Sequence, residues 1–342
     1  MTDRPMFSVL TATHNHAPYL AEALDSVERQ TSEDYEIVVV DDGSTDATPV
    51  VLAEWRRGFE GRRANRVVTQ RIANSGQSAA LAHGFAACRG RYVCLLDSDD
   101  RWGPHKLEAV AAAVAAYPTA GMIVHPLYVI DCQGRRTGDV RPRAARLSAG
   151  DLRAQLRRTC RHAAPATSGL VIRSDVFASL LPMPTTGFSF AADSYLAFGA
   201  SLAAPVVALG EPLGEYRMQE NSTYLRVMLT PEGLAEQVEL QRTIAGHFGL
   251  LRVLHRDSFF ARNDFALVRL TGGPQWLRRY RHLILATARD SAFTAGQRAQ
   301  LIVWWTACAL APARAFPRMW RWFLLKSTGW DRILRAANPG VA

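Results

Sequence analysis

The stretch Tyr92-Val93-Cys94-Leu95-Leu96-Asp97-Ser98-Asp99-Asp100 decides how this sequence folds and where its chemistry lies. It begins as an apolar run, typical of a strand that is covered on both faces, and it ends with three carboxylates in four residues. Like charges this close raise one another's pKa values. A hard divalent cation removes that conflict, since it prefers carboxylate oxygens. A solvated acidic turn is the alternative that these residues alone leave open.

The first hundred or so residues around this stretch repeat the order strand, polar turn, helix. Residues 36–40 are apolar and β-branched almost throughout, which is typical of a strand in a parallel sheet. The apolar spacing predicts four strands and four helices. We expect strands at 7–10, 36–40, 66–69 and 92–96, and helices at about 18–30, up to 57, up to 88, and at 104–117. Short connections between such units predict an α/β fold with a doubly wound, mostly parallel sheet flanked by helices.

Polar side chains follow each of these strands. In doubly wound sheets, ligands bind beyond the carboxyl ends of the strands, so these groups are expected to converge on one edge. The clusters are Thr13-His14-Asn15, Asp41-Asp42, Asn74-Ser75-Gly76-Gln77 and Asp97-Ser98-Asp99.

The pattern changes after residue 120. We expect a longer strand at 122–130, a helix at 148–158, and a helix that starts near 190. Further strands are expected at 168–173, 206–209 and 215–217. Residues 226–342 are predicted to form a helical C-terminal extension, and the last 112 residues of the chain hold six of the eight tryptophans.

The positive charge is confined to the C-terminal third of the chain. Residues 1–230 carry 24 basic and 24 acidic residues, whereas residues 231–342 carry 16 basic and 7 acidic ones. A neutral body with acids at its strand ends argues against a nucleic-acid-binding module. No run of about 18 apolar residues and no secretory signal is present, and the five cysteines are scattered. These features predict a cytoplasmic protein with reduced thiols.

Four ordered motifs resemble the family 2 glycosyltransferases of the GT-A fold, and the resemblance covers roughly residues 6–225. They are Ser8 to Asn15, Val39 to Asp46, Asn74 to Gln77, and Leu96 to Asp100. The resemblance implies transfer of a sugar, with inversion, from a nucleotide-diphosphate sugar to an acceptor hydroxyl, aided by Mg²⁺ or Mn²⁺. It favours a UDP-sugar donor, a glycan or lipid-linked acceptor, and a place in bacterial cell-surface glycan or glycolipid synthesis. It also divides 1–225 into a nucleotide-sugar half (1–118) and an acceptor half (119–225).

The resemblance assigns roles to single residues. Asp42 looks like the acid that binds the nucleobase, and His14 stands where the family often has a stacking Tyr. Asp99 looks like the direct metal ligand, with Asp97 contacting ribose or metal and Asp100 as the substitute ligand. Arg217 could meet the diphosphate. The other residues expected to bind the nucleotide sugar are Thr13, Asn15, Asn74, Gly76, Gln77 and Ser98.

Asp193 is the expected catalytic base. An inverting transfer needs a group that takes the proton of the acceptor hydroxyl. The family usually has Glu-Asp at this helix start, and this chain has Ala192-Asp193. A plain helix-capping role for Asp193 is the alternative. In the closing segment Glu215 to Ser222, the usual His is replaced by Gln219.

The basic tail has two readings. Residues 300–335 mix cations with large apolar rings, as helices that lie on an anionic membrane surface do. A helical subdomain that packs its tryptophans internally is the other reading. For the whole chain, the alternative to sugar transfer is a nucleotide-sugar-binding or nucleotidyltransferase-like α/β protein. A nucleotidyltransferase would carry a Gly-rich loop after the first strand, and the loop 13–16 here has no glycine.

Overall fold

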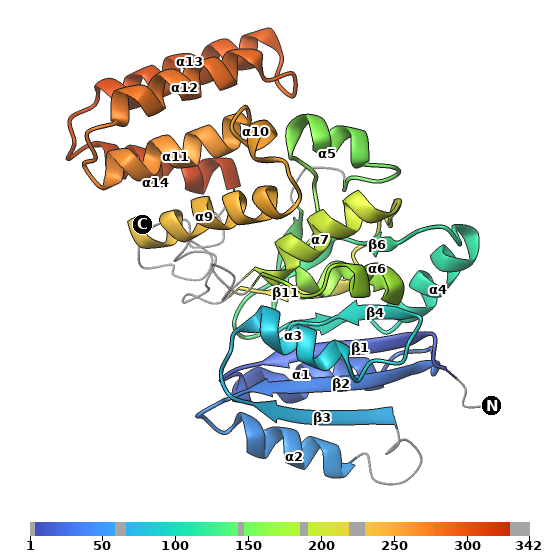
Figure 1. Cartoon of the computed structure of the whole chain (residues 1–342). Coiled ribbons are helices and arrows are strands. Elements are labelled where there is room, and N and C mark those ends of the chain that lie inside the picture. The colour runs from blue at the N-terminus through green and yellow to red at the C-terminus, as the bar shows by residue number, and fades with distance from the viewer. Residues whose placement is uncertain (1–3, 59–65, 143–146, 185–190, 219–229, 329–342) are drawn as a thin grey trace. The chain divides into compact units, whose positions relative to one another are not determined.

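The computed structural model describes residues 4–58, 66–142, 147–184, 191–218 and 230–328 (Figure 1). The chain forms two compact units. The first consists of Met1–Ala154 with His162–Gln219, and the second of Gln155–Arg161 with Glu220–Ala342. The boundary expected at 225/226 lies outside the described residues.

The first unit is built on a seven-stranded sheet of order β10-β6-β9-β4-β1-β2-β3. Strand β9 runs antiparallel to both of its neighbours, and the other paired strands are parallel. The predicted α/β fold with a mostly parallel sheet is therefore confirmed. The strands are β1 (Phe7–Thr13), β2 (Tyr35–Asp42), β3 (Val67–Ile72), β4 (Tyr92–Leu95), β6 (Met122–Val124), β9 (Leu170–Arg173) and β10 (Val206–Ala208).

Helices cover both faces of this sheet. On one face Leu24 of α1 and Leu107 of α4 join the core of β1, β2 and β4. On the other, Gly84 of α3 lies against Leu10 and Val40, and α6 stacks its Phe177 on Phe85. The helices of this unit are α1 (Ala17–Glu28), α2 (Thr48–Gly58), α3 (Gln77–Phe85), α4 (Lys106–Ala116), α6 (Ser174–Ser179) and α7 (Ala192–Ala203).

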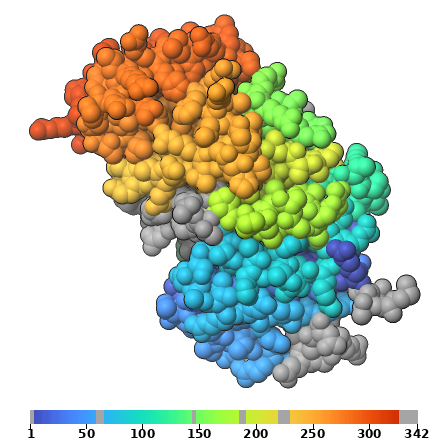
Figure 2. Space-filling model, viewed as in Figure 1, coloured from blue at the N-terminus to red at the C-terminus, as the bar shows by residue number. Residues whose placement is uncertain are grey.

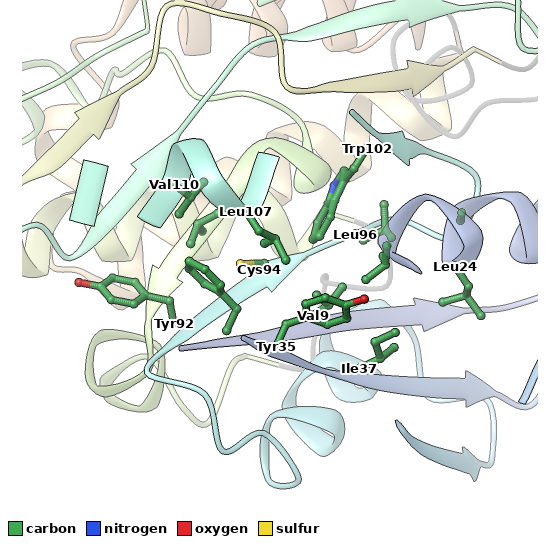
Figure 3. Close-up of a cluster of buried hydrophobic side chains, with 14 of the residues drawn as sticks. Val9, Leu24, Tyr35, Ile37, Tyr92, Cys94, Leu96, Trp102, Leu107 and Val110 are labelled. Atoms are coloured by element: carbon green, nitrogen blue, oxygen red, sulfur yellow. The ribbon is translucent and has the colours of Figure 1, made fainter. Parts of the chain in front are cut away.

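The core beneath the acidic stretch is made of buried apolar side chains. Val9, Ile37 and Cys94 of neighbouring strands belong to one core cluster with Leu24, Leu107 and Val110 of the covering helices (Figure 3). Burying such side chains stabilises the fold by roughly 1.5–3 kcal/mol each. The packing fixes where β1, β2 and β4 end, and so where the polar residues that follow them lie.

Two expected elements differ from the structure. The strand at 122–130 is two strands, β6 and β7 (Leu127–Ile130), which belong to different sheets. The break lies at Pro126, which has no N–H to give to a sheet ladder. The helix expected from Ser148 is the shorter α5 (Arg153–Thr159), because Gly150 pairs instead with Val206 of β10. The second sheet has the order β5-β11-β7-β8, with β5 (Arg101–Trp102), β8 (Arg136–Arg141) and β11 (Gly214–Arg217).

The second unit is helical, as expected, and has its own core around Phe265, Trp305 and Trp320. The Thr294 side chain accepts from the N–H of Gln297, and the Gln297 side chain accepts from Thr294, so a capping box starts α13. The helices of the second unit form the orange and red part of Figure 2. They are α9 (Pro231–His247), α10 (Leu251–Leu254), α11 (Ser258–Leu270), α12 (Trp276–Arg289), α13 (Ala295–Leu310) and α14 (Phe316–Thr328). Across the described part of the chain, every helix is too short or too polar to cross a membrane.

Candidate active site

The loops after β1, β2, β3 and β4 meet at one edge of the large sheet. The register pairs Thr13 with Asp41, and Leu10 with Leu95, so these strands end together. Side chains connect the loops. His16 Nδ1 lies 2.7 Å from Ser98 Oγ, and Gln77 Nε2 donates to Asp97 Oδ1 over 3.1 Å. The structure thus brings the four polar clusters together.

The turn after β2 requires glycine at residue 43. Gly43 has φ +67°, and a Cβ placed there would lie 2.6 Å from the backbone nitrogen of Asn74. Asp41, two residues before this glycine, closes the turn by accepting from the Ser44 N–H at 2.9 Å. Asn15, itself at φ 55°, accepts from the Thr45 N–H at 2.8 Å. Asn15 and Asp41 therefore shape the loop.

Asp42 is buried, and both oxygens of its carboxylate accept backbone hydrogen bonds. Oδ1 accepts from the Ser75 N–H at 2.7 Å, and Oδ2 from the Gly76 N–H at 2.8 Å. The carboxylate therefore fixes the start of α3. The sequence suggests this role only indirectly, through the Asn-Ser-Gly segment that precedes the helix. Each oxygen keeps a second lone pair for a ligand.

His14 is held in one tautomer by the same loops. Its Nδ1 lies 2.8 Å from the Asp42 carbonyl oxygen, which can only accept, so Nδ1 carries the proton. Its Nε2 is then an acceptor, and the side-chain amides of Asn15 and Asn74 lie 3.2 and 3.4 Å away. The ring is only partly buried and lies between the β1, β2 and β3 loops.

The acidic stretch begins with Asp97, just after the end of β4. The Asp97 N–H donates to Ser168 Oγ at 2.9 Å, which ties the loop to the turn Thr167–Gly169. The pKa of Asp97 is raised well above its ordinary value by burial and by the carboxylates of Asp99 and Asp193. Asp193, almost a hundred positions along the chain, is near enough for its charge to act on Asp97.

Asp100 lies inside the protein, unlike its neighbour Asp99, which is partly exposed. Asp100 Oδ1 accepts from the Arg217 N–H at 2.8 Å. Burial, Asp99 and Asp97 raise the pKa of Asp100. Of the two acids, Asp99 is therefore the one placed to meet a ligand, and Asp100 anchors the loop to β11.

Arg217 was expected to meet the diphosphate, but the structure does not expose it to a ligand. Its side chain is buried, and its Nε donates to the Asp99 carbonyl oxygen at 2.7 Å. Its terminal nitrogens donate to Glu22 and to the carbonyls of Asp131 and Cys132. The guanidinium thus holds the backbone of the acidic loop in place. Sequence reasoning missed Glu22, which also pairs with Arg101 and lies on α1 without any motif around it.

Asp193 lies in the first turn of α7, whose N-cap is Ala191. Its Oδ1 accepts from the Ser194 N–H at 2.7 Å, so it caps locally although it is not the N-cap residue. Burial raises its pKa. A carboxylate with raised proton affinity is suited to take a proton from a hydroxyl.

The acidic site suits a cation that is bound partly by protein carboxylates and partly by the substrate. Among the described residues, no three His, Cys, Asp or Glu side chains are gathered as a metal centre. Asp97 and Asp99 offer hard carboxylate oxygens, and burial together with the charge of Asp99 raises the pKa of Asp97. Mg²⁺ is commonly held by one or two carboxylates together with substrate phosphates. The residues present fit such a cation.

Sequence comparison matches residues 8–177 to a family model described as glycosyl transferase family 2. The chain is 30% identical over 218 residues to an uncharacterized glycosyltransferase of Nostoc sp., a match that covers 64% of this chain and 66% of that protein. It is 35% identical over 139 residues to the O-antigen biosynthesis protein RfbC of Myxococcus xanthus, covering 40% of this chain and 11% of RfbC. The matched stretch thus spans less than two thirds of each relative.

Solved structures share the fold. S. aureus TarS in complex with UDP-GlcNAc superposes with a TM-score of 0.61 at 20% identity, over 94% of this chain and 92% of that one. The mannosyltransferase PcManGT of Pyrobaculum calidifontis, in complex with GDP-Man and Mn²⁺, gives a TM-score of 0.51 at 18% identity, over 97% and 88% of the two chains.

Proposed function

Because this chain belongs to glycosyl transferase family 2, we propose that it transfers a sugar from a nucleotide-diphosphate sugar to an acceptor hydroxyl, with inversion at the anomeric carbon. The observation that supports the proposal is the meeting of the polar loops at one edge of the sheet, where His16 contacts Ser98 and Gln77 donates to Asp97. Asp97 and Asp99 offer carboxylate oxygens at this edge, and such oxygens suit a cation that also binds a diphosphate.

Asp99 and Asp97 would hold Mg²⁺ or Mn²⁺ together with oxygens of the donor diphosphate. When bound, the cation offsets the negative charge that grows on the leaving diphosphate. The protein holds these two residues in position before the donor binds. Gln77 and Ser168 orient Asp97, and the Arg217 guanidinium holds the backbone of Asp99.

The remaining acid, Asp193, would act as base. It lies on α7, away in sequence from the nucleotide loops, and its pKa is raised by burial. In its ionised form it would accept the proton of the acceptor hydroxyl as that oxygen attacks the anomeric carbon. Attack from the side opposite the diphosphate gives the inverted product.

The nucleotide would lie over the loops of His14, Asp42 and Asn74. Solved neighbours hold UDP-GlcNAc or GDP-Man, which supports a nucleotide-sugar donor, and we favour a UDP-sugar. The O-antigen biosynthesis protein among the relatives supports a glycan or lipid-linked acceptor in bacterial cell-surface synthesis. The proposal places the enzyme in the cytoplasm, with residues 300–335 in contact with an anionic membrane that carries the acceptor.

A panel of nucleotide sugars tests this function. Wild-type protein is incubated with each donor in Mn²⁺ and in EDTA, and free nucleoside diphosphate is measured with and without a crude membrane acceptor. We expect one donor to be consumed in Mn²⁺ and spared in EDTA. Tight binding of a nucleotide sugar that is never consumed would identify a binding protein instead.

A further inference from the structure

The helical unit exposes large apolar side chains on two neighbouring helices. Val303 and Leu310 of α13 are 70% and 79% exposed, and Trp322 of α14 is 53% exposed. The rings of Trp304 and Trp322 lie 5.1 Å apart, so the two helices are in contact beside these residues. We call the surface of Val303, Leu310 and Trp322, with the arginines described below, the α13–α14 surface.

The tryptophans of this region divide into two groups. Trp305 and Trp320 are buried and belong to the core with Phe316, so internal packing accounts for them. Trp322 is different, because about half of its side chain is exposed despite the contact with Trp304, and exposed apolar surface costs free energy in water. Internal packing therefore explains part of the aromatic content, and leaves the α13–α14 surface unexplained.

The charge of this surface has one sign. Between Asp290 and Asp331 the sequence holds no acidic residue and five basic ones. Three of them, Arg314, Arg318 and Arg321, are exposed and lie beside or on α14. An apolar surface bordered by cations, with an indole at its margin, matches the layered chemistry of a bilayer whose headgroups are anionic.

The support beneath the surface is fixed. Arg269 of α11 donates to the carbonyl oxygen of Ala311 at 2.7 Å, which holds the turn between α13 and α14. Phe316 is fully buried against Phe265, with ring centroids 5.8 Å apart. The exposed side chains are thus presented by a packed helix pair.

We propose that the α13–α14 surface docks on an anionic phospholipid bilayer, with Val303, Leu310 and Trp322 at the headgroup boundary and Arg314, Arg318 and Arg321 on lipid phosphates. Docking keeps the enzyme at the membrane where a lipid-linked acceptor lies, and in this respect the inference rests on the proposed function. The contact itself depends only on the helical unit.

Vesicle co-sedimentation of the full-length protein tests the proposal. Vesicles of phosphatidylcholine alone are compared with vesicles that contain phosphatidylglycerol, at low and high salt. We expect binding to the anionic vesicles that weakens with salt, since salt screens the attraction. The double variant Arg318→Glu/Arg321→Glu should lower the apparent partition coefficient by at least about tenfold, because each cation near an anionic surface contributes about 1 kcal/mol. Trp322→Ala should lower the apparent partition coefficient at both salt concentrations.

A matched control separates this surface from the overall positive charge. Arg157→Glu/Arg158→Glu on α5 changes the net charge equally at exposed positions, and should bind vesicles like the wild type. Wild-type protein that stays in solution at low salt, or equal loss in both double variants, would overturn the proposal. So would a dimer in solution that Trp322→Ala dissociates, because the surface would then belong to a second copy. Vesicle binding without sugar transfer would refute the proposed function and leave this inference standing.

Discussion

At the scale of single residues, adjacent acids of one motif have different tasks. Asp99 and Asp100 are equivalent in the sequence, yet Asp100 is buried and accepts from the Arg217 N–H, while Asp99 is partly exposed. The difference arises because β5 begins at Arg101 and turns the chain toward β11. A pairing between segments more than a hundred residues apart cannot be read from the motif.

Two alanine variants test this division. Asp99→Ala should weaken Mn²⁺-dependent binding of UDP by at least tenfold, because a carboxylate ligand of the cation is lost. Asp100→Ala should lower the free energy of unfolding by about 1–3 kcal/mol, because the buried Arg217 N–H loses its acceptor. Calorimetric titration and urea unfolding measure the two effects. The assignment is wrong if Asp100→Ala is fully stable and Asp99→Ala binds normally.

Lys106 is a second residue whose role the sequence hides. It is fully buried, donates to the Ser168 carbonyl oxygen at 2.8 Å, and lies 3.5 Å from the centre of the Trp102 ring. Burial lowers the pKa of Lys106 to about 7. It therefore supports the same turn, Thr167–Gly169, that holds Asp97.

The low pKa of Lys106 predicts a pH-dependent effect of Lys106→Met. The unfolded chain keeps a lysine pKa near 10.4, so between about pH 7 and 10 it binds the proton that the folded protein lacks. The folded wild type must therefore gain stability over the variant as pH rises through this range, by at most about 1.4 kcal/mol per pH unit. Urea unfolding of both proteins from pH 7 to 9.5 measures the gap. A gap that does not change with pH would mean that Lys106 titrates normally.

At the scale of elements, the parallel strands, the later strands β9, β10 and β11 and the helix α7 were predictable, whereas the break within 122–130 and the start of α5 were not. Apolar β-branched runs define β1, β2 and β4 within a few residues, because each run is covered on both faces. The division of 122–130 at Pro126 and the late start of α5 depend on pairing with distant strands. The expected roles of the nucleotide-binding residues remain predictions that substitution and ligand binding must test.

The start of α3 offers a test of element packing. Asp42→Ala removes the carboxylate that accepts hydrogen bonds from the N–H groups of Ser75 and Gly76, each worth about 1.5–3 kcal/mol. We expect a loss of about 2 kcal/mol or more in unfolding free energy, and weaker UDP binding. Asp46→Ala is the control: Asp46 also accepts from two backbone N–H groups, of Ala17 and Thr48, but it is exposed, so the variant should lose less. Equal losses would show that Asp42 has no special role in anchoring α3.

At the scale of the whole molecule, the change in charge and composition along the sequence separates the same two parts as the two compact units of the structure. The neutral part carries the α/β sheet and the acidic site, and the basic part is helical with its own aromatic core. The family and fold expected from the motifs are confirmed. Which tryptophans are core and which are exposed could not be predicted, because a helix of this composition has apolar residues on more than one face.

The central claim is that Asp97 and Asp99 belong to one sugar-transfer site with the distant Asp193 as the base. The most direct test measures turnover and donor binding of wild type and Asp193→Asn, with the donor found in the panel and Mn²⁺ present. We predict unchanged donor affinity, within about twofold, and a loss of transfer of at least about 100-fold, the usual contribution of a positioned base. Full transfer by Asp193→Asn would contradict the account.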